Sequence, residues 1–219
     1  HIEIFPNEKK KLKKLVLVGN PNVGKSLIFN HLSNLYAEVS NFPGTTVSIT
    51  SAKYKNYIIY DTPGIYGVSS FNDEEKVAKN IILEGDIILN IVNGLNLERD
   101  LFLTLQLIDM GKKVSVIINM MDEVRKQNIL IDTKKLSQIL GVEVFETSAL
   151  RREGFENLDK AIELARVGKQ DKLVKEKLKL LDKNSLEQDK ALLLLEGDRE
   201  LIQQYNVNLP IEDLREELY

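Results

Sequence analysis

The sequence predicts an α/β fold with a mostly parallel sheet, because short apolar runs rich in β-branched residues alternate with segments of helical period as far as residue 167. Only Lys55 and Asn56 separate the second run from the third, a link so short that these two runs must form an antiparallel hairpin. We therefore expect a six-stranded sheet with one antiparallel edge strand. The six runs are Leu15–Val18, Val47–Tyr54, Tyr57–Tyr60, Ile87–Val92, Val114–Ile118 and Val142–Phe145.

A change in composition divides the chain. After residue 167, Leu, Lys, Glu and Gln dominate and the apolar spacing becomes purely helical. We expect an N-terminal extension over 1–13, an α/β domain over 14–167 and a helical subdomain over 168–219. Ser185 is expected to cap a helix that Gly197 ends, and Pro210 to stand in the first turn of a last helix.

Composition and charge exclude several classes of function. The 219 residues are 43% hydrophobic, enough for a sizeable core, and 30 basic against 33 acidic side chains leave a net charge of −3. No overall positive field attracts nucleic acid or anionic lipid. The absence of cysteine excludes disulfides, thiol nucleophiles and cysteine-ligated metals. Apolar runs such as Ala191–Leu195 are far too short to span a bilayer, so we expect a soluble chain.

The first predicted strand is followed directly by the sequence GNPNVGKS, which matches the phosphate-binding pattern GxxxxGK[ST] in the required place between a strand and a helix. Backbone N–H groups of such a loop surround phosphate oxygens, Lys25 can reach the β- and γ-phosphates, and the Ser26 hydroxyl can ligate Mg²⁺. The predicted nucleotide-binding residues of this loop are Gly19, Asn20, Pro21, Asn22, Val23, Gly24, Lys25 and Ser26.

A second candidate segment, Asp61-Thr62-Pro63-Gly64, follows the third predicted strand. A carboxylate at this place can hold Mg²⁺ through a water molecule, and the Gly64 amide can approach a γ-phosphate where a side chain would block the way. The tetrapeptide alone is also ordinary turn chemistry, so it gains meaning only from the other motifs.

The third candidate segment would read the base. Asn119, Met120 and Asp122 have the NxxD spacing in which the aspartate accepts from the ring N–H and amino group of guanine, a donor pair that adenine lacks. Met120 replaces a lysine whose stem would pack on the base, so we expect guanine selectivity with weaker affinity. After the sixth run, the backbone N–H groups of Ser148 and Ala149 can reach the guanine oxygen.

These motifs occur in the order P-loop, DxxG, NxxD and SA, each at the carboxyl end of a predicted strand, where open α/β sheets bind ligands. Together they predict a P-loop GTPase of Ras-like fold that binds GTP and GDP and hydrolyses GTP to GDP and phosphate. Mg²⁺ would be held by Ser26 and, through water, by Asp61. A threonine of the 38–47 stretch is expected to join them only when the γ-phosphate is present, and both Thr45 and Thr46 qualify.

Further segments are similar to those of one bacterial family. They are Asn41–Val47 (NFPGTTV), Asp61–Gly67 (DTPGIYG), Asp73–Ala78 (DEEKVA), Leu95–Leu101 (LNLERDL) and Leu194–Asp198 (LLEGD). With the P-loop, they make nearly the whole chain resemble the cytosolic GTPase region of ferrous iron transport protein B. The resemblance implies that the helical subdomain slows nucleotide release, and that it is incomplete here because the stretch after its LLEGD segment is short.

The resemblance also assigns roles to single residues. Thr46 directly precedes the valine of the family motif NxPGxTV, so it is implied as the magnesium threonine, with Gly44 beside the nucleotide. Asn22 matches the position that ligates K⁺ in potassium-stimulated members. Ile65 stands where Ras-like enzymes carry a water-orienting glutamine, so we expect slow hydrolysis that potassium stimulates. The catalytic residues implied are Lys25, Thr46, Gly64 and Asn22.

Partners and location follow from the resemblance alone. It implies the transmembrane part of the same full-length protein as a partner, at the cytoplasmic face of the bacterial inner membrane, with nucleotide state coupled to Fe(II) uptake. It also allows small accessory Feo proteins and a homo-oligomer, and no nucleic acid is expected.

Two alternative functions stay open. One is an Era-like ribosome-assembly GTPase, although the C-terminal segment has neither a GxxG loop nor an aromatic platform for RNA. The other is a GTP/GDP sensor module without useful turnover, which Ile65 favours because its side chain can neither donate nor accept a hydrogen bond.

Overall fold

The computed structural model describes residues 12–34, 36–181 and 186–205. Its strands are β1 (Lys13–Gly19), β2 (Ala37–Asn41), β3 (Ser48–Tyr54), β4 (Tyr57–Asp61), β5 (Ile87–Asn93), β6 (Lys113–Asn119), β7 (Val144–Glu146) and β8 (Arg166–Val167). Its α-helices are α1 (Lys25–Ser33), α2 (Asp73–Glu84), α3 (Leu97–Asp109), α4 (Met121–Lys126), α5 (Thr133–Leu140), α6 (Leu158–Glu163), α7 (Lys172–Leu181), α8 (Gln188–Leu195) and α9 (Arg199–Tyr205). Short 3₁₀ turns are η2 (Gly94–Asn96) and η3 (Phe155–Asn157).

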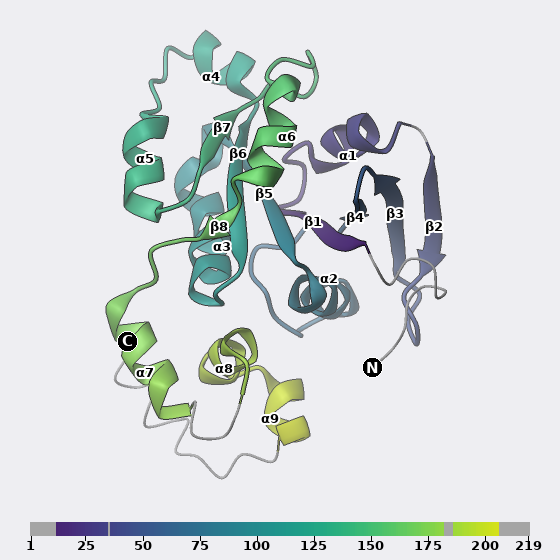
Figure 1. Ribbon diagram of the computed structural model, residues 1–219, viewed down its shortest axis with the longest axis vertical. Helices are drawn as coiled ribbons and strands as arrows, with labels where there is room; N and C mark the ends of the chain where they lie inside the picture. Colours follow the sequence, from purple (N-terminus) through teal and green to yellow (C-terminus); the bar gives the residue numbers. More distant parts are fainter. Residues whose placement is uncertain (1–11, 35, 182–185, 206–219) are drawn as a thin grey trace.

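The described strands form one mixed sheet in the order β2-β3-β4-β1-β5-β6-β7, with β8 paired to β6. Strands β4, β1, β5, β6 and β7 are parallel, whereas β2, β3 and β8 run antiparallel to their neighbours. Figure 1 shows helices on both faces of this sheet. The predicted α/β fold and the hairpin between β3 and β4 are confirmed.

Two strands escape prediction because neither carries the buried alternation that marks a strand. Every residue of β2 is exposed, and β8 has two residues, both exposed. Because β2 pairs with the outer side of β3, the expectation that β3 would be the antiparallel edge strand is wrong. The last predicted strand is also displaced, since β7 covers Val144–Glu146.

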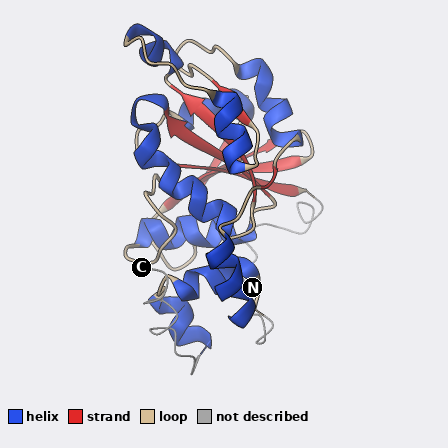
Figure 2. Ribbon diagram, turned by 90° about the vertical axis from the view of Figure 1, so that its left-hand side faces the viewer, coloured by secondary structure: helices blue, strands red, loops and turns tan. Residues whose placement is uncertain are grey.

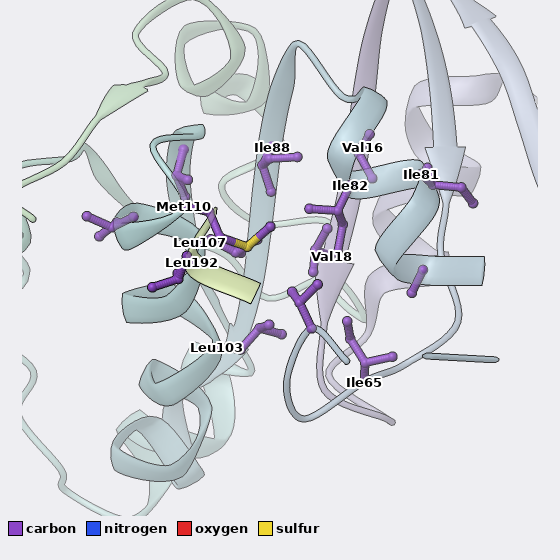
Figure 3. Close-up of a cluster of buried hydrophobic side chains, with 14 of the residues drawn as sticks. Val16, Val18, Ile65, Ile81, Ile82, Ile88, Leu103, Leu107, Met110 and Leu192 are labelled. Carbon is purple, nitrogen blue, oxygen red and sulfur yellow. The ribbon is translucent and has the colours of Figure 1, made fainter. Parts of the chain in front are cut away.

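Alternation along β1 supplies both faces of the sheet with core side chains. Leu15 and Leu17 belong to the core under α1 and α6, whereas Val16 and Val18 belong to the larger core on the opposite face. Figure 3 shows this larger core, which includes side chains of β1, β5, α2, α3 and Leu192 of α8. The helical part of the chain is therefore packed onto the sheet-containing part through one continuous core.

Helix α8 is buried along its whole second half, since all residues of Ala191–Leu195 are buried. The helix ends before Gly197, as predicted; this glycine has a φ of +87°, and the N–H of Asp198 donates to the Leu193 carbonyl at 2.8 Å. The predicted cap Ser185 and Pro210 lie outside the described residues, and the domain boundaries stay a prediction.

Figure 2 shows the C-terminal helices gathered at one end of the sheet. A charged cluster joins them to α2: the Lys79 ammonium, 1% exposed, lies 3.2 Å from the Asp198 carboxylate and 2.6 Å from that of Glu200. We call these three residues the Lys79 cluster. None of the described helices has the length and apolar character needed to cross a membrane.

Candidate nucleotide site

The loop between β1 and α1 has the backbone of a phosphate-binding loop. Asn22 and Gly24 adopt φ values of +63° and +87°, which turn the chain sharply before α1 begins at Lys25. A Cβ atom on Gly24 would lie 2.3 Å from Nδ2 of Asn119, so only glycine fits there. The loop thus packs directly on the end of β6, and its Asn22 side chain is exposed.

Asn119 holds this loop in place. Its Nδ2 donates to the Val23 carbonyl at 2.8 Å, and its Oδ1 accepts from the Ala149 N–H at 2.8 Å and from the Thr147 hydroxyl at 3.1 Å. The side chain is 2% exposed. The asparagine of the NxxD motif therefore ties the P-loop to the SA segment and positions both.

Asn20 also points into the protein. Its Nδ2 donates to Oδ1 of Asp100 in α3 at 2.7 Å, and the other oxygen of Asp100 accepts from the Asn93 N–H at 2.8 Å. Asp100 is 1% exposed and also pairs with Arg99 at 3.0 Å. Asp100 thus positions the P-loop, a role that its sequence pattern does not indicate although it lies in the LNLERDL segment on which the family resemblance rests.

Lys25, Ser26 and Asp61 meet at the carboxyl ends of β1 and β4, and we call them the phosphate-site cluster. The Ser26 hydroxyl donates to Oδ2 of Asp61 at 2.8 Å, and the Lys25 ammonium lies 3.0 Å from Oδ1. That second oxygen is buried and, although close to the ammonium, has no hydrogen bond of good geometry. A hydroxyl beside a carboxylate with spare acceptor capacity fits the hard oxygen ligands that Mg²⁺ prefers.

The segment after Asp61 lies directly against the P-loop. The Thr62 hydroxyl donates to the Leu17 carbonyl at 2.8 Å, and the Ile65 N–H donates to the Gly19 carbonyl at 3.1 Å. A Cβ atom on Gly64 would lie 2.8 Å from Cα of Pro21, so glycine is needed for this approach. Ile65 is 2% exposed, in the large core of Figure 3, and Pro63 is half-buried.

The two candidate magnesium threonines differ in their surroundings. The Thr45 hydroxyl donates to the Phe42 carbonyl at 3.1 Å and accepts from the Val47 N–H at 3.2 Å, which closes a turn that contains Gly44. Thr46 is exposed. The hydroxyl of Thr45 is thus engaged in local structure.

Asp122 and Ser148, which the sequence predicts to read the base, contact each other at one end of the site. Oδ1 of Asp122 accepts from the Ser148 hydroxyl at 2.8 Å, and Oδ2 lies 3.3 Å from Nε of Arg151. The Ser148 hydrogen bond lowers the pKa of Asp122 below its usual value, with a smaller contribution from Arg151. Met120 adopts a φ of +63° directly before α4, and the buried Ala149 follows Ser148.

Comparison with known proteins identifies relatives of this site and fold. Residues 13–162 match the family model described as ferrous iron transport protein B. The Fe(2+) transporter FeoB of Helicobacter pylori is 47% identical over 145 residues, which are 64% of this chain and 23% of that protein. The transporter of Campylobacter jejuni is 41% identical over 155 residues, which are 68% of this chain and 25% of that protein. The chain thus spans about a quarter of the length of these curated relatives.

Solved structures agree with this result. NFeoB from S. thermophilus bound to GDP.AlF4⁻ and K⁺ is 33% identical with a TM-score of 0.79, over 94% of this chain and 90% of that one. The cytosolic domain of L. pneumophila FeoB is 29% identical with a TM-score of 0.82, over 93% and 89%. Because the family model alone covers more than half of the sequence, the chain belongs to the ferrous iron transport protein B family.

Proposed function

We propose that this chain is a GTPase that binds GTP and GDP at the loop Gly19–Ser26 and hydrolyses GTP to GDP and phosphate. The phosphate-site cluster is the observation that carries this proposal, because it places an ammonium, a hydroxyl and a carboxylate together at the end of β1. Loop N–H groups and the start of α1 would bind the phosphates, with the Lys25 ammonium against the β- and γ-phosphates.

Mg²⁺ would be held by Ser26 and, through water, by Asp61, and when bound it would supply positive charge to the phosphate oxygens. Thr46 would join them in the GTP state. The turn hydrogen bonds of Thr45 support this choice, because its hydroxyl already has partners whereas Thr46 is exposed. The Thr46→Ala variant should therefore retain GDP affinity and lose hydrolysis, and a silent result would transfer the role to Thr45.

Asp122 would accept from the ring N–H and amino group of guanine, and the N–H groups of Ser148 and Ala149 would approach the guanine oxygen. The lowered pKa of Asp122 keeps this carboxylate ionised and therefore an acceptor only. Asp122→Asn should relax the preference for guanine, because an amide presents a donor as well as an acceptor.

Hydrolysis would proceed without a glutamine side chain to orient the attacking water, since Ile65 is buried and apolar. Charge beyond that of Mg²⁺ would come from K⁺ bound by Asn22, whose side chain is exposed at the loop. The relative from S. thermophilus that binds K⁺ with GDP.AlF4⁻ supports this assignment. In other GTPases an arginine finger raises the rate of hydrolysis by about 10³ to 10⁵. Here K⁺ and the Gly64 amide would have to supply part of that rate enhancement.

The test is GTP turnover with Mg²⁺ in matched potassium and sodium salts, alongside GDP and ADP affinities. We expect slow turnover that potassium raises, GDP binding and no ADP binding. Asn22→Gly is the cleanest variant, because glycine accepts the φ of +63° without strain, and Asn34→Gly, at an exposed asparagine with a φ of +48° after α1, is the matched control. Equal rates in both salts, unchanged in Asn22→Gly, would defeat the potassium assignment. Good GDP binding with no turnover would instead support the sensor module.

For the full-length protein we propose that the nucleotide state of this domain is coupled to Fe(II) uptake. Family membership supports this proposal, and the transmembrane part of the same protein, at the cytoplasmic face of the bacterial membrane, would be the partner. Small accessory proteins and a homo-oligomer stay predictions. Loss of Fe(II) uptake in cells that carry Lys25→Ala in the full-length protein would support the coupling, whereas normal uptake would oppose it.

A further inference from the structure

Arg151 lies at the carboxylate that would read guanine. Its Nε is 3.3 Å from Oδ2 of Asp122, the oxygen that the Ser148 hydroxyl leaves free. The Asp122 side chain is 7% exposed, whereas that of Arg151 is 52% exposed. A buried acceptor is thus paired with a half-solvated donor, whose charge returns to water when it moves away while the Ser148 hydroxyl still donates to the carboxylate.

Guanine and the Arg151 guanidinium present similar hydrogen-bond donors to a carboxylate. The guanine edge that a carboxylate binds presents a ring N–H beside an amino group on one carbon, and a guanidinium presents the same pair of N–H donors in one plane. Adenine has no such pair. Arg151 is therefore an intramolecular group that can occupy the same acceptor as guanine.

The turn that carries Arg151 is tightly held. Ser148 and Glu153 exchange backbone hydrogen bonds at 3.0 and 3.2 Å, and the Arg151 N–H donates to the Ser148 carbonyl at 3.0 Å. The Glu153 carboxylate is paired with Arg125 of α4. Arg152, in contrast, lines a pocket formed with residues of α1, Ala149 and Phe155. Two adjacent arginines thus face different surroundings.

We propose that Arg151 competes with guanine for the Asp122 carboxylate and so lowers the affinity of this domain for guanine nucleotides. The inference rests on the proposed role of Asp122 in base recognition. Because the Arg151 side chain is half-exposed, its pairing with Asp122 should contribute about 1 kcal/mol at most, so removal of the competitor should tighten GDP binding about twofold to fivefold. The gain should come without any change in phosphate contacts.

The experiment compares GDP and ADP affinities and GDP association rates of the wild-type chain with Arg151→Gln, Arg151→Lys and the matched control Arg152→Gln. Arg151→Gln should bind GDP more tightly and faster, Arg151→Lys should lie between it and the wild type, and Arg152→Gln should match the wild type. ADP affinity should not respond, because adenine makes no use of Asp122. The difference should shrink in high salt, which screens the charge of the half-exposed Arg151 side chain.

A double-mutant cycle with Asp122→Asn supplies the second readout, since Arg151→Gln should then have no effect on GDP affinity. Weaker GDP binding by Arg151→Gln would overturn the proposal and make Arg151 a residue that supports the base. Equal effects of Arg151→Gln and Arg152→Gln, or an equal gain for ADP, would overturn it as well. Failure of the wild-type chain to prefer GDP over ADP would instead defeat the proposed role of Asp122.

Discussion

Two lysine–aspartate pairs in this molecule have nearly the same length and opposite surroundings. Lys25 lies 3.0 Å from Asp61, and Lys79 lies 3.2 Å from Asp198. The side chains of the first pair are 10% and 14% exposed, and one Asp61 oxygen lacks a hydrogen bond. Those of the second are 1% and 3% exposed, and Glu200 adds a second carboxylate to the ammonium. The first pair is suited to receive a ligand, whereas the second joins two parts of the fold.

The contribution of an ion pair depends on what surrounds the remaining partner when the other one is removed. A carboxylate left alone in the interior has no compensation, but one at the mouth of a binding loop can take water, a hydroxyl or a metal ion instead. We therefore expect the Lys79 cluster to determine stability and the phosphate-site cluster to determine binding.

The largest effect should come from Lys79→Met, which leaves Asp198 buried without its cation. Loss of one partner of a buried pair costs about 3–5 kcal/mol, and urea unfolding should show a decrease of this size. Lys53→Met on the exposed side of β3 is the matched control and should change little. Recovery of part of the loss in the double variant with Asp198→Leu would sharpen the assignment, while a loss below about 1 kcal/mol would contradict it.

Lys25→Met should weaken GDP binding about 10-fold to 150-fold, because a charge-assisted hydrogen bond contributes roughly 1.5–3 kcal/mol and GDP offers the ammonium its β-phosphate. Its unfolding free energy should stay close to that of the wild type, since Ser26 still donates to Asp61. Calorimetric titration with GDP measures the first quantity and urea unfolding the second. A large loss of stability with normal GDP affinity would instead assign Lys25 to the stability of the fold rather than to binding.

Asn20→Ala should have an intermediate effect that falls on both properties. It removes one donor to the buried Asp100 and a bond that fixes the P-loop, so we expect a loss of about 1–3 kcal/mol in stability. GDP affinity should fall by a smaller factor than in Lys25→Met, because no phosphate contact is lost. If titration and unfolding both match the wild type, Asp100 does not position the loop.

The smallest effect concerns pH. The Ser148 hydroxyl holds the pKa of Asp122 below its usual 3.8, so this carboxylate is ionised in the folded protein at every pH above that value. The preference for GDP over ADP should thus be constant between about pH 5.5 and 8 and be lost only as the pH falls through the lowered pKa. A midpoint inside this range, measured by nucleotide titration, would show that another group controls base selection.

The difference between the two clusters also explains what could be predicted from the sequence. The P-loop and the DTPG segment are each an unbroken stretch of sequence that directly follows a predicted strand. Their sequence pattern alone therefore indicates which groups meet at one edge of the sheet. Lys79 and Asp198 are 119 positions apart, and neither stands in a phosphate-binding pattern, so no local signal joins them. The same holds for Asp100, whose contact with the P-loop spans 80 positions.

Strand β2 escaped prediction for a different reason, because an edge strand exposed on both faces has no hydrophobic period. Residue type alone likewise could not distinguish Thr45 from Thr46 as the magnesium ligand, since both carry the same hydroxyl. The hydrogen bonds of Thr45 are a property of the turn and could be found only in the structure.

The most direct test is urea unfolding of the wild type, Lys25→Met and Lys79→Met, each with Mg²⁺ and with or without GDP at one fixed concentration, about 100 times the wild-type Kd. Ligand at 100 times its Kd adds about 2.7 kcal/mol to the stability of a folded protein that binds it. We predict that Lys25→Met keeps its stability but loses much of the gain from GDP, and that Lys79→Met loses stability but keeps the gain. A full gain from GDP in Lys25→Met, or none in Lys79→Met while it remains folded, would contradict the division of roles between the two clusters.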